Sequence, residues 1–297
     1  MAEKQRFFAY GLPKSGTTLL QYTLNAHPQV SCPSEHYFIN YLYKQLKQTL
    51  AQYDQVLATV NHRTGGVNAD VPTSPILNAC FARVCETMID AAAGEKPIAG
   101  ANDNAFMGHI DSLSQLFPRA KFVVIFRNPI ERAVSAYHHN LKLYRETGEV
   151  AHKQLIDNAG GFEPWVRGTV ANYSKFAERY CSYAQSQQRL LLIRFEDLAE
   201  RKRETLTTVF QFLGATVDNA ILDKLLDITS FQAMRSQASR PAFFRSGRSE
   251  KDESISMGLR QSLESEYSNA LNLMGYANGD SNWENPSVSI AGDYIDD

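Results

Sequence analysis

The sequence predicts an α/β protein with three layers, in which a central parallel sheet lies between helices. Three short apolar runs support this prediction, and each is followed by a segment with apolar residues at helical spacing. Such runs are typical of strands that are buried on both faces. Their alternation with helices favours parallel βα units, whose ligands bind at the carboxyl ends of the strands.

The predicted strands and helices follow in the order of the chain. We expect buried strands at residues 7–12, 97–99, 121–126 and 190–195. Helices are expected where apolar residues recur every three or four positions, at residues 17–26, 130–143, 203–213 and 259–273.

The domain boundaries follow from the length and from the remaining segments. Residues 1–276 are expected to form a single domain, since 297 residues fit one large α/β sheet. The helical segments 34–93 and 150–189 are expected to cap it. Residues 277–297 hold five acidic residues and no Lys or Arg, which favours a loosely packed tail. Within the caps, helix breaks are expected at Thr64-Gly65-Gly66, Pro72, Pro75, Gly160-Gly161 and Pro164.

Composition excludes several classes of protein. A hydrophobic share of 43% and a charged share of 21% are typical of a globular protein. The net charge of −2 argues against binding of nucleic acid, so any anion must be held by a local site. The chain shows no signal sequence, no run of 18 apolar residues and no CxxC pair. We therefore expect a cytoplasmic protein with buried thiols and no integral membrane association.

The first candidate site is the loop GLPKSGTT, residues 11–18, between the first strand and the first helix. Backbone N–H groups and the helix dipole converge there on an anion, and Lys14 adds a positive charge. The usual phosphate loop GxxxxGK[ST] places Lys after the second Gly, whereas Lys14 precedes Gly16 by two residues. This shift argues against an ATPase that binds Mg²⁺ through the residue after Lys. The alternative interpretation is a plain strand-to-helix turn with a Ser or Thr cap.

The segment PKSGTTLL resembles the 5′-phosphosulfate loop of sulfotransferases that use 3′-phosphoadenosine 5′-phosphosulfate (PAPS). The resemblance implies that Lys14 shields the departing 5′-phosphate and that adenosine 3′,5′-bisphosphate (PAP) is the product. It also implies that no metal is required, because fixed cations and N–H groups supply the positive charge. The donor-binding residues of this loop would be Lys14, Ser15, Gly16, Thr17 and Thr18.

A second motif, RNPIERAVSAY, follows the strand at 121–126 and is similar to the family's 3′-phosphate motif. Arg127 offers a planar fork of donors, and Ser135 offers a hydroxyl about two turns into the next helix. The resemblance implies that both hold the 3′-phosphate of PAPS. Taken singly, Arg127 could form a surface ion pair at the end of the strand, and Ser135 could be a small residue at a helix contact.

Two downstream segments extend the resemblance. The segment ITSFQAM looks like the one that supplies a hydroxyl and an adenine-stacking ring, here Thr229 and Phe231. The segment FFRSGR resembles a 3′-phosphate loop, with Arg245 and Gly247 in the places of its Arg and Gly. Phe195 stands where the family has a Tyr that hydrogen-bonds near adenine, so only packing carries over there.

The catalytic base is expected after the first helix. Animal small-molecule enzymes of the family carry it in a KTH motif, and the corresponding residues Asn102-Asp103-Asn104 contain neither Lys nor His. The segment around Glu35 instead resembles the protein-tyrosine and carbohydrate branches, where a Glu in this place is the base. Glu35 could also be a plain first-turn carboxylate of a helix. His36 and Asp103 are the other candidates for the base.

The sequence therefore predicts transfer of a sulfuryl group from PAPS to a hydroxyl of a small molecule or carbohydrate, by in-line displacement. Two alternatives stay open, a phosphate-loop nucleotide kinase and a nucleotide-binding module without catalysis. The aromatic residues at 36–43 fit either an acceptor pocket or the core of a helix. Neither the acceptor nor the oligomeric state is predicted.

Overall fold

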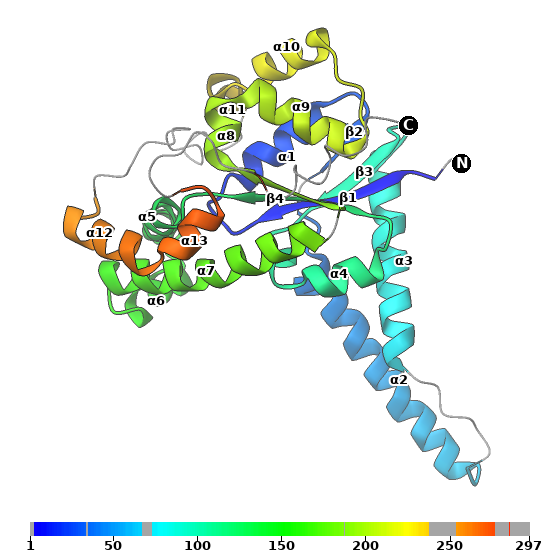
Figure 1. The fold of residues 1–297 in the computed structure, drawn as a ribbon. Coiled ribbons are helices and arrows are strands. Elements are labelled where there is room, and N and C mark those ends of the chain that lie inside the picture. The colour runs from blue at the N-terminus through cyan, green and yellow to red at the C-terminus, as the bar shows by residue number, and fades with distance from the viewer. Residues whose placement is uncertain are drawn as a thin grey trace.

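The computed structural model describes residues 3–33, 35–66, 73–186, 188–237, 254–276 and 285. It confirms the predicted α/β class, because five parallel strands form one sheet in the order β2-β3-β1-β4-β5 (Figure 1). The two-residue strand β2 was not predicted, since so short a segment shows no pattern. The strands are β1 (Gln5–Gly11), β2 (Val30–Ser31), β3 (Ile98–Asn102), β4 (Lys121–Phe126) and β5 (Leu190–Arg194).

Helices cover both faces of this sheet (Figure 1). One face packs against α1 (Thr17–Ala26), α8 (Phe195–Glu200), α9 (Lys202–Leu213) and α10 (Asn219–Ile228). The other face packs against α3 (Thr73–Ala93), α4 (Ile110–Leu116), α7 (Phe162–Ser186) and α13 (Ser268–Leu273). A third cluster joins α5 (Pro129–Thr147), α7 and α12 (Met257–Glu266), and α6 (Val150–Asn158) packs on α5. The remaining helices are η1 (Phe38–Tyr43), α2 (Lys44–Arg63), η2 (Asn104–Gly108) and α11 (Phe231–Gln237).

The two faces explain why the strands are apolar throughout. Along β1, Phe8 and Tyr10 lie in the core with α7, whereas Phe7 and Ala9 lie in the core with α1. All four side chains are fully buried. Each phenylalanine buried in this way stabilises the fold by roughly 1.5–3 kcal/mol.

Strand β1 lies at the point where the strand order reverses. The chain runs from β1 toward β3 on one side and toward β4 on the other, and in folds of this kind ligands bind at the carboxyl ends of the strands at such a point. Gly11 ends β1 opposite Ile125 of β4. A Cβ at Gly11 would lie 2.3 Å from the carbonyl oxygen of Ile125, so only glycine lets the strands meet here.

Several sequence-based boundaries are corrected by the structure. The breaks predicted at Pro75 and Pro164 are wrong, because both prolines lie in the first turn of a helix, α3 and α7 respectively. Proline is tolerated there since the first N–H groups of a helix have no partner within it. The helix predicted at 259–273 is two helices that meet at Tyr267. Pro72 lies outside the described residues.

Helices α2 and α3 form an arm of the molecule (Figure 1). The C-terminal half of α3 packs on the sheet through Phe81, Cys85 and Ile89. In contrast, α2 buries none of its side chains and extends away from the sheet (Figure 1). In the described part of the predicted cap 34–93, α3 and Phe38 of η1 therefore cover the sheet.

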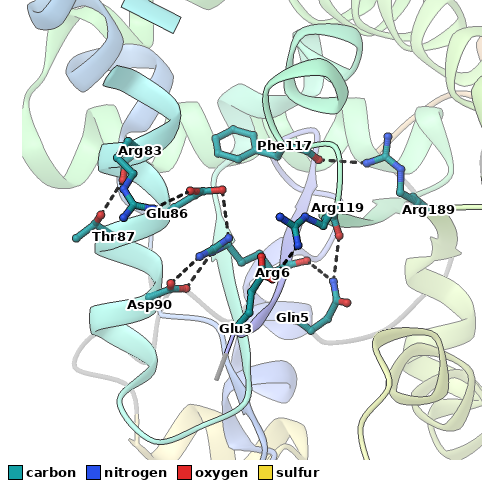
Figure 2. Close-up of polar contacts among 10 residues, drawn as sticks. All are labelled: Glu3, Gln5, Arg6, Arg83, Glu86, Thr87, Asp90, Phe117, Arg119 and Arg189. Atoms are coloured by element: carbon teal, nitrogen blue, oxygen red, sulfur yellow. Dashed lines mark hydrogen bonds and ion pairs between the residues drawn. The ribbon is translucent and has the colours of Figure 1, made fainter. Parts of the chain in front are cut away.

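The amino ends of the strands are bounded by paired charges (Figure 2). Arg6 of β1 binds two carboxylates of α3, with its Nη2 atom 2.7 Å from Oδ2 of Asp90 and its Nη1 atom 3.2 Å from Oε1 of Glu86. These ion pairs tie α3, and with it the base of the arm, to the centre of the sheet.

Two further observations complete the fold. No helix in the described ranges is long and apolar enough to cross a membrane. Of the predicted tail, Asn285 is described, and its side-chain amide donates to the carbonyl of Leu192 in the edge strand β5 at 2.7 Å.

Candidate active site

The loop after β1 forms a cradle of backbone groups. Lys14 and Gly16 adopt left-handed conformations, with φ of 71° and 91°, and Ser15 donates its N–H to the carbonyl of Leu12 at 3.1 Å. No side chain caps α1, and its first turn holds no acidic residue. The Oγ atom of Ser15 is buried and, among the described residues, has no hydrogen-bond partner. These features together suit an anion at the N-terminus of α1.

One aromatic ring supports both sides of this cradle. A Cβ at Gly16 would lie 2.4 Å from Cδ2 of Phe195, so the ring presses directly against the loop. The guanidinium carbon of Arg127 lies 4.8 Å from the centre of the same ring, a cation–π distance. The sequence predicted only packing for Phe195. Its contact with Arg127 depends on the pairing of β4 with β5 and could not be seen in the motif.

Arg127 joins the two predicted phosphate motifs. Its Nη1 atom donates to the carbonyl of Lys14 at 3.4 Å, which brings the end of β4 against the loop after β1. The next residue, Asn128, caps α5 by accepting from the N–H groups of Ile130 and Glu131 at 3.0 and 3.3 Å. Ser135 is half-buried two turns further along α5.

A buried acid fixes the start of α5. Glu196, at the start of α8, accepts from the N–H group of Asn128 at 3.0 Å and from the hydroxyl of Tyr276 at 2.9 Å. Burial raises the pKa of Glu196, and these hydrogen bonds oppose that rise. The position of Arg127 is therefore set by a hydrogen-bond network behind it.

A second arginine, Arg132 in α5, lies behind the loop. Arg132 is only 7% exposed, and its guanidinium donates to the carbonyls of Pro13 and Thr169 at 3.3 and 3.4 Å. Burial lowers the pKa of Arg132 to about 10, and the charge of Arg127 contributes to the same shift. At neutral pH the group still carries its charge. No sequence pattern had distinguished Arg132 from a surface residue of the helix.

His139 of α5 also responds to the positive charge of the loop. Burial and the ammonium of Lys14 lower its pKa to about 4, so the imidazole is neutral at physiological pH. Lys14, Arg127 and Arg132 thus gather positive charge around the loop, where the sequence predicts the phosphate site.

Glu35 follows β2, the edge strand that pairs with β3, and it meets the residues at the end of β3. The side-chain amide of Asn104 donates to Oε1 of Glu35 at 2.9 Å, and the amide of Asn102 lies 3.5 Å from the carbonyl of Thr17. Glu35 is accessible to solvent, and partial desolvation, followed by the charge of Asp103, raises its pKa. The end of β3 therefore contacts both the first turn of α1 and the predicted base.

His36, the reserve candidate for the base, points toward the core. Its ring stacks on Phe38, with centroids 4.8 Å apart, and burial lowers its pKa. The Nδ1 atom is buried without a hydrogen-bond partner in the described part of the chain. This placement favours Glu35 over His36 as the group that faces an acceptor.

The predicted adenine site is described only in part. Thr229 is 3% exposed, and its hydroxyl donates to the carbonyl of Leu225 at 2.5 Å. Its own carbonyl accepts from Lys202, whose pKa burial lowers to about 8. The side chain of Phe231 lies outside the described residues. Arg245 and Gly247 lie outside them as well, so their roles stay predictions.

The geometry at the carboxyl end of β1 defines a class of protein. A glycine-containing loop that leads from a strand into an uncapped helix N-terminus is typical of α/β proteins that bind phosphorylated nucleotides. Residues 6–219, more than half of the chain, match the Sulfotransferase family. The chain therefore belongs to the Sulfotransferase family.

Two curated relatives are protein-tyrosine sulfotransferases. The protein from Drosophila melanogaster is 27% identical over 169 residues, which cover 52% of this chain and 32% of the relative. Protein-tyrosine sulfotransferase 2 from Gallus gallus is 25% identical over 228 residues, which cover 74% of this chain and 54% of the relative. The chain thus matches less than two thirds of the length of either protein.

Solved structures share the fold at low sequence identity. The mouse sulfotransferase SULT7A1 in complex with PAP has a TM-score of 0.54 and 17% identity, with 93% of this chain and 89% of that chain covered. A sulfotransferase from Alicyclobacillus acidocaldarius has a TM-score of 0.52 and 18% identity, with 92% and 95% covered. Because both structures cover more than nine-tenths of this chain, the shared fold continues beyond residue 219, where the family match ends.

Proposed function

We propose that this protein transfers the sulfuryl group of PAPS to a hydroxyl group of a small molecule or carbohydrate. The observation that carries the proposal is the hydrogen bond between Arg127 and the carbonyl of Lys14. It joins the motif that the resemblance assigns to the 5′-phosphosulfate with the motif assigned to the 3′-phosphate. The mouse protein of similar fold was solved with PAP, which is consistent with the same donor here.

The residues of the loop fit the 5′ end of such a donor. The N–H groups at the start of α1 and the buried hydroxyl of Ser15 offer donors to an anion. Thr17 and Thr18 follow in the same turn and add hydroxyl groups. Because α1 has no acidic residue in its first turn, nothing there repels the phosphate.

At the 3′ end, Arg127 and Ser135 would hold the second phosphate. The stack of Arg127 on Phe195 fixes the plane of the guanidinium, which suits a two-pronged contact with phosphate oxygens. Thr229 and Phe231 would contact adenine, with Arg245 and Gly247 completing the phosphate site. These assignments rest on the resemblance alone.

The chemistry requires an attacking oxygen, a proton acceptor and stabilisation of the leaving group. As the acceptor oxygen bonds to sulfur, the bond from sulfur to the bridging oxygen breaks and its electron pair passes to the 5′-phosphate. Lys14 would neutralise the charge that develops on that oxygen. Glu35 would take the proton of the acceptor hydroxyl, and its raised pKa strengthens it as a base.

Thermal unfolding with added PAP tests the donor site. A ligand at 100 times its dissociation constant stabilises a protein by about 2.7 kcal/mol, so PAP is expected to raise the melting temperature by several degrees. Adenosine 5′-monophosphate is the matched control, since it lacks the 3′-phosphate that Arg127 would hold. No shift at millimolar PAP would contradict the proposal.

A transfer assay then distinguishes the three functions. Incubation with PAPS and a panel of phenols, alcohols and sugars should yield a sulfated product and PAP, detected by mass spectrometry. A shift with ATP and Mg²⁺ but not with PAP would favour the kinase. Binding of PAP without transfer to any acceptor of the panel would favour the module without catalysis.

A further inference from the structure

The loop that follows β3 holds a cluster of side chains to which the proposed function gives no role. Asp103 caps η2, with its Oδ1 atom accepting from the N–H group of Ala105 at 2.9 Å. Asn104 turns in the other direction, toward Glu35, with 2.9 Å between Nδ2 and Oε1. Asp103 thus holds the loop in place, and the next residue, Asn104, holds the predicted base.

Asp103 is buried in a way that needs an explanation. The residue is 3% exposed, and its Oδ2 atom has no hydrogen-bond partner in the described part of the chain. A buried carboxylate oxygen without a partner costs free energy that an apolar residue would not. Such groups are retained mainly where they serve a function.

The charged groups that face this cluster are few. Asp103 interacts with the carboxylate of Glu35 and with the imidazole of His36. Among the described residues, no other titratable group shifts the pKa of Glu35 or of His36. In that part of the chain, the charged groups of this cluster are two acids and one histidine.

We propose that Asn104 and Asp103 are positioning residues for Glu35, since Asn104 holds its Oε1 atom and Asp103 caps the turn on which Asn104 lies. The inference rests on the proposed function, because it assigns partners to the base of that reaction. With Oε1 held by Asn104, the Oε2 atom of Glu35 is left to accept the proton of the acceptor hydroxyl.

The two partners act on Glu35 in opposite senses. A neighbouring negative charge disfavours ionisation, so Asp103 raises the pKa of Glu35. A hydrogen bond donated to a carboxylate favours its ionised form, so Asn104 lowers it. Asp103 therefore makes Glu35 a stronger base, while Asn104 keeps it ionised and oriented.

Opposite shifts of the pH–rate profile test the inference. Activity should rise with pH as Glu35 ionises. Asn104→Ala removes the stabilising hydrogen bond, so the rise should move to higher pH, and the loss of orientation should lower kcat about 100-fold. Asp103→Asn removes the repulsion, so the rise should move to lower pH.

Two variants serve as controls. Asn104→Gln keeps an amide, so its kcat should lie between that of Asn104→Ala and that of the wild type. The exposed Asn272→Ala should leave kcat and the pH–rate profile unchanged.

A second readout separates this inference from the proposed function. Carboxyl carbon NMR can follow the titration of Glu35 without substrate in the wild type, Asn104→Ala and Asp103→Asn, with Glu35→Gln to assign the signal. The Glu35 midpoint should rise in the first variant and fall in the second. Melting curves and PAP binding should show that both variants are folded.

Each outcome of these measurements decides one question. Wild-type protein that transfers no sulfuryl group would overturn the proposed function, while the NMR titration would still test the partners of Glu35. An active enzyme whose variants keep the wild-type pH profile, or shift in the same direction, would overturn the inference.

Discussion

Polar side chains at the two ends of the sheet differ in how completely they are paired. At the amino ends of the strands, arginines are paired: Arg6 binds two carboxylates of α3, and Arg189 donates to the carbonyls of Phe117 and Ala120 (Figure 2). At the carboxyl ends, buried atoms of Ser15, His36 and Asp103 have no hydrogen-bond partner within the described ranges.

This difference separates stability from function within one sheet. A buried polar atom without a partner costs roughly 1–3 kcal/mol, so the carboxyl end carries a cost that the amino end avoids. Ligand atoms can supply the missing partners only at the carboxyl end. Substitutions at the amino end should therefore change stability and leave activity intact, whereas those at the carboxyl end should change binding or activity as well as stability.

The largest expected effect comes from Lys14→Asn. Asparagine tolerates the left-handed conformation of this residue but removes the positive charge. We expect kcat to fall about 100- to 1000-fold, in line with the loss of one electrostatic contact to a transition state. Steady-state kinetics and a melting curve check this. A folded variant with wild-type kcat would remove Lys14 from the mechanism.

Gly16→Ala should affect both binding and stability. Its Cβ would collide with Phe195 and would have to adopt φ of 91°. We expect a loss of about 1–3 kcal/mol in stability and a weaker shift of the melting temperature by PAP. Denaturant unfolding with and without PAP measures both. Gly148→Ala, whose Cβ meets no atom and whose φ is also positive, serves as the control for backbone strain alone.

Arg6→Met examines the other end of the sheet. The side chain of Arg6 is 18% exposed, so loss of both ion pairs should lower the free energy of unfolding by about 1–2 kcal/mol. PAP affinity and kcat should not change. Arg119→Met is the matched control, because its pair with Glu3 is highly exposed and worth about 0–1 kcal/mol. A loss of activity in Arg6→Met would break the separation of the two ends.

Asp103→Asn should stabilise the protein by a small amount. Burial raises the pKa of Asp103 in the folded state, so folding favours the protonated acid, and stability is lost as the pH rises through that value. The amide can keep the bond to the N–H group of Ala105. We expect a melting temperature about 2–4 °C higher at pH 8 and no difference below pH 4. A lower melting temperature at pH 8 would show that the carboxylate is satisfied.

Local patterns predicted much of the fold. The helix at 17–26 and the strand at 121–126 have the predicted bounds, because apolar runs and loop glycines act over a few residues. Lys14 and Arg127 belong to the two predicted phosphate motifs and are in contact through the carbonyl of Lys14, while their roles in binding stay predictions.

What the sequence did not predict depends on residues that are distant along the chain. Glu35 and Asn104 are 69 positions apart and meet because β2, which precedes Glu35, pairs with β3, which precedes Asn104. The stack of Arg127 on Phe195 likewise requires β4 and β5 to pair. The burial of Arg132 depends on how α5 packs behind the loop. No periodicity within a single segment contains that information.

The projecting helix α2 has a consequence for how such proteins diversify. Leu46, near its start, packs partly against the core and none of its side chains is fully buried, so core packing places little limit on substitutions along the rest of the helix. The loop after β1, by contrast, admits no Cβ at Gly11 or Gly16 without a collision. Evolution can therefore change α2 beyond Leu46 while the loop after β1 stays fixed, and a designer can exchange that part of α2 without repacking the sheet.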